Sequence, residues 1–233
     1  MMKHKIMFAA LVGMLVVCKA WSQTAVPTIT FTDKENETEV EMNAGESQTT
    51  NAPLEIKMMA NLSNYTGYTA KCEWKLYDTS VGETKPILDR FDENTTYTLT
   101  ASGSYGVKLY VTFTDADGEV IEYESEAFTI NITKSSLSCP DGFSPNDDSI
   151  NDKFEVTYQS IVKMKGVIFN RWGQKVYEFD LSNVDKGWDG RQNGRYVKDG
   201  VYFLNLQATG SDGVKYDIKK AINILKGLRD YDE

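Results

Sequence analysis

The sequence predicts an all-β protein, two consecutive β-sandwich domains that follow a cleaved signal peptide. Three observations predict this fold class: β-branched and aromatic residues are abundant, apolar residues alternate with polar ones in several segments, and turn residues separate these segments. The 233 residues include 13 Tyr and 10 Phe, and 41% are hydrophobic, which is typical of a folded globular protein. No apolar 3.6-residue period persists over several turns, so we expect few helices.

Residues 1–23 have the composition of a secretory signal peptide. Lys3 and Lys5 precede an apolar run over residues 6–17, and Ala20 offers a small residue for cleavage, with a second candidate position after Gln23. The apolar run is too short to span a bilayer, which needs about 20 apolar residues. We therefore expect export of the chain to the cell surface or the extracellular space.

The charge of the mature chain restricts its partners and its chemistry. Cleavage removes His4, the single histidine, and three lysines, which leaves 22 of the 25 Lys and Arg against 34 Asp and Glu, a net charge of −12. Such a chain repels phosphate backbones, so nucleic acid is not an expected partner. Without an imidazole, a Ser-His-Asp or Cys-His site and a histidine-ligated metal are excluded.

Residues 24–134 form the first predicted β-sandwich. Apolar and polar residues alternate over residues 107–113, which predicts a strand with one buried face. A turn at residues 115–118 leads into a returning strand over residues 120–132, so the two form a hairpin. Shorter strands are expected at residues 28–32, 39–42, 54–60, 70–77, 87–91 and 97–100.

This first domain resembles the polycystic-kidney-disease (PKD) and immunoglobulin-like sandwiches of secreted bacterial proteins. The segments that carry the resemblance are residues 71–76, 103–111 and 115–118. It implies an architecture and no specific binding activity. Trp74 is expected in the core of this sandwich.

Residues 137–228 form the second predicted β-sandwich, and residues 229–233 follow as an acidic tail. A loop containing Pro140 and Gly142 opens this domain. Strands are expected at residues 154–158, 164–169, 175–179, 201–208 and 216–225.

Four motifs give the second domain its most specific signal. They lie at residues 143–154, 169–177, 187–190 and 199–203. In this order they resemble the gliding-motility-associated C-terminal domain, which is the type B sorting domain of the type IX secretion system. The resemblance implies that the type IX translocon and an outer-membrane partner protein engage this domain. It assigns sorting to Phe143, Pro145, Asn146, Asn151, Asp152, Asn170, Arg171, Trp172, Gly173, Trp188, Asp189, Gly190, Asp199, Gly200 and Tyr202.

Each motif also has a structural interpretation. Residues 170–173 predict a hairpin turn in which Gly173 adopts a left-handed backbone and Trp172 folds over the strand pair to cover apolar side chains. Asp189 can accept hydrogen bonds from the backbone of its own turn. In the functional interpretation, Arg171 is exposed and the export machinery reads it together with the neighbouring loops.

The loop that opens the second domain contains a candidate calcium site. Asn146, Asp148 and Asp152 are evenly spaced and offer the oxygen ligands that Ca²⁺ prefers. An EF-hand loop counted from Asn146 would need Gly and Glu where this chain has Asn151 and Thr157. The alternative is a turn capped by the same side chains, and no other cofactor is indicated.

Cys72 and Cys139 remain after export and could form a disulfide in an oxidising compartment. The alternative is a buried Cys72 packed beside Trp74, with Cys139 free or partly covered near the domain junction.

The sequence supports three functional hypotheses. The first is a non-enzymatic exported protein in which the C-terminal domain is a sorting signal and the immunoglobulin-like domain is cargo, with a role in adhesion or gliding. The second is a module that binds a surface carbohydrate or protein through Tyr65, Tyr68 and Tyr77. The third is hydrolysis by paired carboxylates, for which the sequence has acids and no framing motif.

Overall fold

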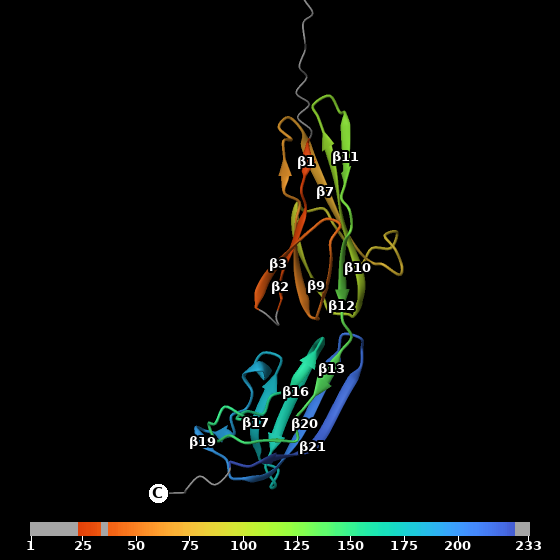
Figure 1. Cartoon of the computed structure of the whole chain (residues 1–233). Helices are drawn as coiled ribbons and strands as arrows, with labels where there is room; N and C mark the ends of the chain where they lie inside the picture. The colour runs from red at the N-terminus through yellow and green to blue at the C-terminus, as the bar shows by residue number, and fades with distance from the viewer. Residues whose placement is uncertain (1–22, 34–36, 227–233) are drawn as a thin grey trace, which may run out of the picture.

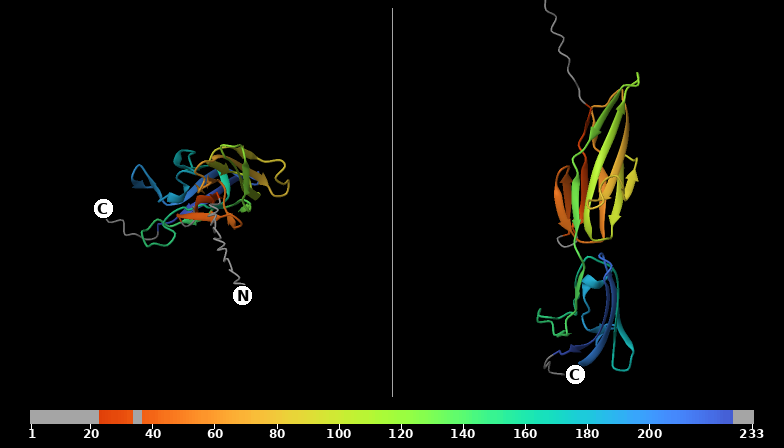
Figure 2. Two further views of the ribbon diagram at one scale, coloured as in Figure 1. Left: turned by 90° about the horizontal axis from the view of Figure 1, so that it is seen from above. Right: turned by 90° about the vertical axis from the view of Figure 1, so that its right-hand side faces the viewer.

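The computed structural model describes residues 23–33 and 37–226. The predicted signal peptide, apart from Gln23, and the predicted acidic tail lie outside the described residues. Two separate hydrophobic cores define an N-terminal unit, residues 23–134, and a C-terminal unit, residues 135–226. The two units lie end to end (Figure 1), and the side view in Figure 2 shows the same elongated arrangement.

The N-terminal unit is a β-sandwich of two main sheets. One sheet contains, in order, β3 (Thr38–Asn43), β2 (Thr28–Asp33), β5 (Leu54–Met59) and β9 (Asn94–Leu99). The other contains β4 (Ser47–Thr50), β12 (Phe128–Ile132), β10 (Gly103–Thr114), β7 (Thr69–Asp78) and β8 (Leu88–Arg90), and β11 (Val120–Glu124) also pairs with β10. A short ladder joins β1 (Thr24–Ala25) to β6 (Leu62–Ser63).

The period-two pattern of the sequence determines the core between these sheets. Val107, Leu109, Val111 and Phe113 of β10 all point inward and are no more than 1% exposed. Trp74 of β7 is fully buried, and its Nε1 donates a hydrogen bond to the Glu93 carbonyl at 3.2 Å. Because its polar atom has a partner, the indole contributes its full apolar area to the core.

The predicted strand over residues 120–132 is wrong in one respect, because the structure divides it into β11 and β12. Ser125 causes the interruption. Its hydroxyl accepts a hydrogen bond from the Leu109 N–H at 3.0 Å, and its own N–H donates to the Leu109 carbonyl at 2.9 Å. Ser125 is 4% exposed, and its buried hydroxyl replaces a backbone carbonyl as the acceptor for a β10 N–H. Regular pairing with β10 resumes at Phe128.

The C-terminal unit contains one large sheet covered by short ladders and loops. The sheet order is β14 (Gly142–Phe143), β21 (Lys215–Ile224), β20 (Gly200–Gly210), β16 (Ile161–Phe169) and β17 (Lys175–Asp180). The covering layer includes β13 (Ser136–Ser138) paired with β15 (Thr157–Gln159), β18 (Arg191–Gln192) paired with β19 (Arg195–Tyr196), and the 3₁₀ turn η1 (Val184–Lys186). The all-β fold class is confirmed, and within the described residues no helix has the length and apolar character needed to cross a bilayer.

A chain of small polar side chains connects the two units. The Thr133 hydroxyl donates to Asn51 Oδ1 at 2.6 Å, so the Ser160 hydroxyl, 2.6 Å away, donates its own hydrogen to Thr133. Ser160 also accepts a hydrogen bond from the Ala52 N–H at 3.1 Å. Val162 of β16 packs against the N-terminal core beside this chain. The junction is therefore fixed by hydrogen bonds that are largely shielded from water.

We expect Ser160→Ala to lower the free energy of unfolding by about 1–3 kcal/mol, because the buried Ala52 N–H loses its acceptor and Thr133 loses a donor. Urea denaturation followed by circular dichroism measures the effect. Ser136→Ala removes an exposed hydroxyl close by and serves as the control, with a change within about 0.5 kcal/mol. Equal effects of the two substitutions would show that the junction does not depend on Ser160.

Candidate recognition surface

The residues assigned to sorting divide into buried and exposed sets. Phe143, Pro145, Trp188, Gly190 and Tyr202 are buried in the C-terminal unit. The exposed members are Asn151, Arg171, Trp172, Gly173, Asp189 and Asp199, and the remaining ones are half-buried. The motifs therefore supply both the core of the unit and part of its surface.

Trp188 is the centre of the buried set. Its indole is 1% exposed, stacks on Tyr177 at 5.5 Å between ring centroids with an interplanar angle of 13°, and meets Phe143 at 5.5 Å and Tyr202 at 6.0 Å. Its Nε1 donates a hydrogen bond to the Arg191 carbonyl at 2.9 Å. These contacts connect the covering loops to the large sheet, so the Trp-Asp-Gly motif has a structural role here.

Gly190 allows the turn after Trp188 to pass close to the opening loop. Its φ is 74°, and a Cβ built at this position would lie 2.9 Å from the Pro145 side chain. Asp189 Oδ1 accepts a hydrogen bond from the Arg191 N–H at 3.0 Å, which confirms the predicted side-chain-capped turn. A side chain at residue 190 would be strained by its backbone and would also meet Pro145.

The 170–173 turn exposes its two large side chains. Asn170 Oδ1 accepts hydrogen bonds from the N–H groups of Trp172 and Gln174, each at 3.0 Å, and Gly173 adopts the expected left-handed backbone with a φ of 76°. The prediction that Trp172 covers the strand pair is wrong, because its side chain is 74% exposed. The capped turn points it into solvent, where the Arg171 guanidinium lies 4.3 Å from its ring centroid.

A groove of about 380 Å³ lies between this turn and residues 192–202. Arg171 and Trp172 line it from the turn, and Arg195, Tyr196 and Lys198 line it from the covering layer. The groove therefore combines three cationic side chains with aromatic surface, at the part of the unit where two sorting motifs meet.

The sequence reasoning missed Arg195 and Lys198. The two-residue connection between β18 and β19 is Asn193-Gly194, and both residues have positive φ, 52° and 80°. This pair is a strong hairpin signal, and it could have shown that Arg195 emerges from a tight turn. The sequence instead appeared as one long loop, so the basic residues between two motifs were not singled out.

The loop after Phe143 is organised around the Asp152 carboxylate. Oδ1 accepts hydrogen bonds from the N–H groups of Asn146 at 2.9 Å and Asp147 at 2.7 Å, and Oδ2 accepts one from Ser149 at 2.7 Å. Burial raises the pKa of this carboxyl, but the three N–H donors outweigh burial and hold the pKa below its usual value.

These bonds fit the capped turn and do not fit the candidate calcium site. The N–H groups that converge on Asp152 form a positive concavity that suits its own carboxylate, and a cation would be repelled there. Asp148 is also used locally, with Oδ1 accepting from the Ile150 N–H at 2.8 Å and Oδ2 from Asn146 Nδ2 at 2.8 Å. No group of His, Cys, Asp and Glu side chains in the described ranges has an arrangement suited to a metal ion.

Cys72 and Cys139 are both free thiols in this structure, an arrangement that fits the alternative to the disulfide. Cys72 is buried in the N-terminal core, where burial, with the Glu93 charge as a smaller cause, raises its pKa to about 11. Cys139 packs against the C-terminal core, and burial raises its pKa too. The two side chains belong to different cores, which keeps them from pairing.

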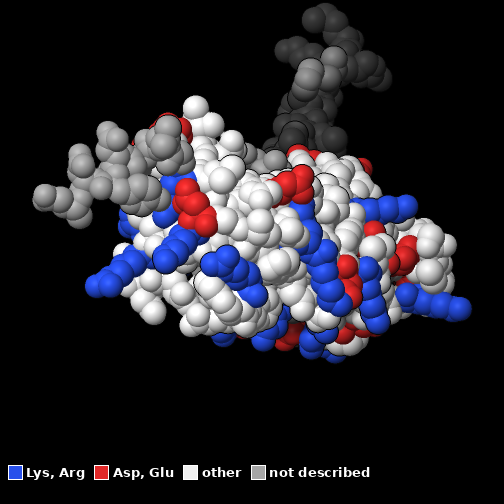
Figure 3. All heavy atoms as spheres, turned by 90° about the horizontal axis from the view of Figure 1, so that it is seen from below, with Lys and Arg blue, Asp and Glu red and all other residues white. Residues whose placement is uncertain are grey.

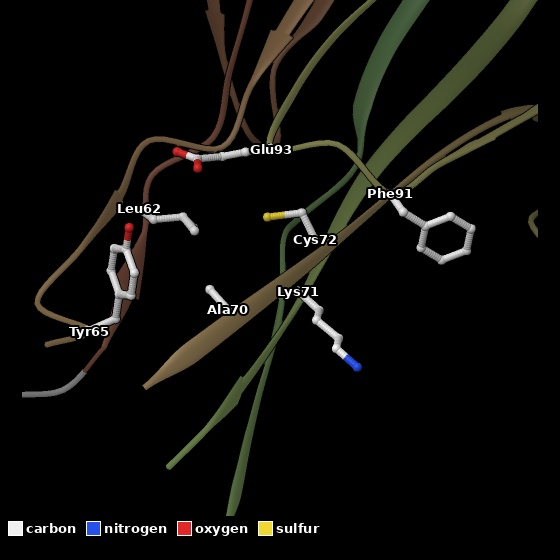
Figure 4. A pocket seen from close by; sticks show the side chains of 7 residues that line it. All are labelled: Leu62, Tyr65, Ala70, Lys71, Cys72, Phe91 and Glu93. Carbon is white, nitrogen blue, oxygen red and sulfur yellow. The ribbon is translucent and has the colours of Figure 1, made fainter. Parts of the chain in front are cut away.

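A second concave site lies on the N-terminal unit. It encloses about 270 Å³ and is lined by Leu62, Tyr65, Ala70, Lys71, Cys72, Phe91 and Glu93. Figure 4 shows the Cys72 sulfur pointing toward the side of the pocket where Tyr65 lies, whereas the Phe91 ring on the other side points away from the other labelled side chains. Phe91 is 72% exposed, whereas Tyr65 is half-buried and packs against Phe113 with 6.1 Å between ring centroids.

Of the other two tyrosines expected to contact a ligand, neither is freely exposed. Tyr68 is half-buried and packs against the N-terminal core. Tyr77 is half-buried and covers Gly106, where an added Cβ would lie 2.4 Å from its ring. Their positions favour packing over ligand contact.

The two indoles of the C-terminal unit should respond oppositely to truncation. We expect Trp188→Ala to lower the free energy of unfolding by about 3–5 kcal/mol, because it empties the aromatic core. Trp172→Ala should change it by no more than about 0.5 kcal/mol, since that side chain is exposed. Urea denaturation followed by circular dichroism compares the variants. A large loss from Trp172→Ala would show that this indole packs on the fold.

Comparison with known proteins finds a family match in the C-terminal unit. Residues 137–223 match the family described as the CHU_C type IX secretion signal domain. No curated protein matches the chain.

Solved structures resemble the chain at low sequence identity. Dimeric latent PorU from Porphyromonas gingivalis is 12% identical with a TM-score of 0.28, and the match covers 88% of this chain and 20% of that one, so this chain spans about a fifth of PorU. The FN1-FN3 domains of chicken CNTN1 are 11% identical with a TM-score of 0.33, covering 80% of this chain and 68% of that one. Fibronectin(III)-like modules of Clostridium thermocellum CbhA are 16% identical with a TM-score of 0.25, and the match covers 78% of this chain and 88% of that one.

Proposed function

Because the chain carries a CHU_C type IX secretion signal domain at residues 137–223, we propose that it is a non-enzymatic exported protein whose C-terminal unit is the sorting signal and whose N-terminal unit is the cargo. The family match is the observation that carries this proposal. A signal domain of this kind indicates export to the cell surface or the extracellular space and an interaction with the secretion system. We also propose that an outer-membrane partner protein engages the C-terminal unit and that the exported protein acts in adhesion or gliding.

The exposed residues of the four motifs support the sorting role. The core of the unit needs Trp188 and Tyr202, but it does not need Arg171 or Trp172, which extend into solvent from a capped turn. Trp and Arg side chains are enriched among the residues that bind protein partners. The arrangement is consistent with recognition of a folded surface by the export machinery.

The titratable groups support a role without catalysis. Hydrolysis by paired carboxylates requires one acid whose pKa is raised so that it can donate a proton near neutral pH. Wherever a carboxyl of the described chain has a shifted pKa, the shift is downward, through hydrogen bonds or ion pairs that favour the charged form. These carboxyls are Asp78, Glu83, Asp152, Glu178, Asp180 and Asp212.

A reporter fusion tests the sorting role. We expect residues 134–233, placed after a signal peptide and a fluorescent protein, to direct the reporter outside a host that has a type IX system. The fusion begins at residue 134 because Ser135 donates to Asp212 Oδ1 at 2.7 Å and lies 2.9 Å from the Tyr216 hydroxyl.

Residues 1–133 followed by the same reporter form the matched control and should remain in the periplasm. Cell fractionation and fluorescence measure both proteins. Periplasmic retention of the first fusion, with the reporter folded and intact, would refute the sorting role.

A second candidate function is binding of a surface carbohydrate or protein by the N-terminal unit. The pocket favours it, because a half-buried aromatic residue, Tyr65, and an exposed one, Phe91, both line one concave site. We expect any such ligand, detected on a glycan array with the mature chain, to bind Phe91→Ala about tenfold more weakly. Val81→Ala removes an exposed apolar side chain outside the pocket and should leave binding unchanged. Absence of glycan binding by the wild type would remove the carbohydrate form of this candidate.

A further inference from the structure

The groove beside the 170–173 turn lies at the end of the C-terminal unit farthest from the cargo. Ile161 of β16 and Gly210 of β20 are adjacent to the junction residues Ser160 and Ser211, and the groove lies at the opposite ends of the same two strands. Figure 3 views the molecule from this end, where several Lys and Arg side chains are visible, interspersed with Asp and Glu. The groove is therefore accessible to a partner without displacement of the N-terminal unit.

The cations of the groove are unpaired. Arg171, Arg195 and Lys198 are exposed, and none of them forms an ion pair with any residue in the described ranges. The one acid of the lining, Asp199, is already used by Lys226, with 3.4 Å between Nζ and Oδ1. Elsewhere in this unit many cations are neutralised, as Lys165 and Lys175 are by Glu178. The groove thus keeps three positive charges available to a ligand.

This positive site contrasts with the charge of the rest of the protein. Residues 24–134 contain 8 Lys and Arg against 19 Asp and Glu, a net charge of −11. Residues 137–226 contain 13 against 12, a net charge of +1. An acidic partner is repelled by the cargo and attracted by the far end of the C-terminal unit, so the charge distribution orients the chain during encounter.

The aromatic wall narrows the class of ligand. Trp172 is 74% exposed and Val201 is 47% exposed, so the lining offers apolar contact beside the cations. Binding to an anionic membrane typically relies on clusters of 4–8 Lys and Arg, more than the three found here. Trp and Arg are the side chains most enriched where protein partners bind tightly. A polypeptide with acidic and apolar side chains can pair with the cations of the groove and also cover its apolar surface.

We infer that this groove binds an acidic polypeptide segment of the outer-membrane protein that receives the chain, an inference that rests on the proposed sorting function. Acidic side chains of the segment pair with Arg171, Arg195 and Lys198, and an apolar side chain covers Trp172. The turn cap and the β18–β19 hairpin hold these groups in place before binding, which limits the entropy lost on association.

A binding experiment tests the groove directly. Calorimetry uses a synthetic peptide of Glu and Leu as the probe and heparin as a second probe, with the mature chain and with a chain ending at Lys226. We expect the peptide to bind, and we expect the triple variant Arg171→Glu, Arg195→Glu, Lys198→Glu to bind about tenfold more weakly or not at all. The control variant Lys163→Glu, Lys165→Glu, Lys215→Glu makes the same charge change at the junction end of β16 and β21 and should bind as the wild type does.

Three outcomes of that experiment would overturn the inference. The first is equal weakening by the two triple variants, which would mean that only net charge matters. The second is binding of heparin but not of the peptide, which would assign the groove to an anionic polysaccharide. The third is peptide binding only by a chain ending at Lys226, which would make the acidic residues 227–233 of the chain itself the occupant.

Export of the reporter fusion separates this inference from the sorting function. We expect the groove triple variant of residues 134–233 to leave the reporter in the periplasm and the control triple variant to export it. If the wild-type fusion and the groove variant are exported equally, the groove is not the docking site while sorting stands. If the wild-type fusion itself is retained, the sorting function is wrong, and the peptide titration still decides whether the groove binds an acidic segment.

Discussion

Burial of the Trp188 indole is the interaction on which the C-terminal unit depends. A single five-stranded sheet has one apolar face to cover, and among residues 135–226, the part of this unit that the structure describes, no second large sheet covers it. Trp188 meets that need because it contacts rings contributed by β14, β17 and β20 of the sheet, and because its N–H donates to the Arg191 carbonyl of β18. One side chain thus joins the loops to the sheet, and the position of the β18–β19 hairpin follows from it.

Separate sets of side chains form the core of this unit and its exposed surface. The buried aromatic residues determine where the chain can turn, and the turns determine which side chains point outward. Asn170 illustrates the link, since its amide oxygen satisfies two N–H groups of the turn and thereby directs Trp172 into solvent. Side chains placed on capped turns need no flexibility to become accessible to a partner.

Strands with a clear apolar period could be predicted from the sequence, and strands without one could not. The inward face of β10 follows directly from its alternation, and β20 and β21 were predicted within a few residues of their bounds. β4 was missed because Ser47–Thr50 has no apolar residue and pairs as an exposed edge strand with β12.

The site was harder to predict than the fold for a related reason. Trp172 and Trp188 lie in similar local sequences, each beside a glycine-containing turn. What distinguishes them is contact with residues distant in sequence, such as Phe143 and Tyr202, and no local pattern contains that information. The cationic residues of the groove were missed for the same reason, because only the tertiary fold brings Arg195 to the same groove as Arg171.

The junction between the units has an evolutionary consequence. Apart from Val162, the side chains described there are short alcohols and amides, and few apolar surfaces have to match across it. A neighbouring domain can meet such a boundary with a few backbone groups, so recombination of coding segments could attach the same C-terminal unit to unrelated passengers. A junction that needs so few matched contacts would let a cell use one type of C-terminal unit with many different N-terminal domains.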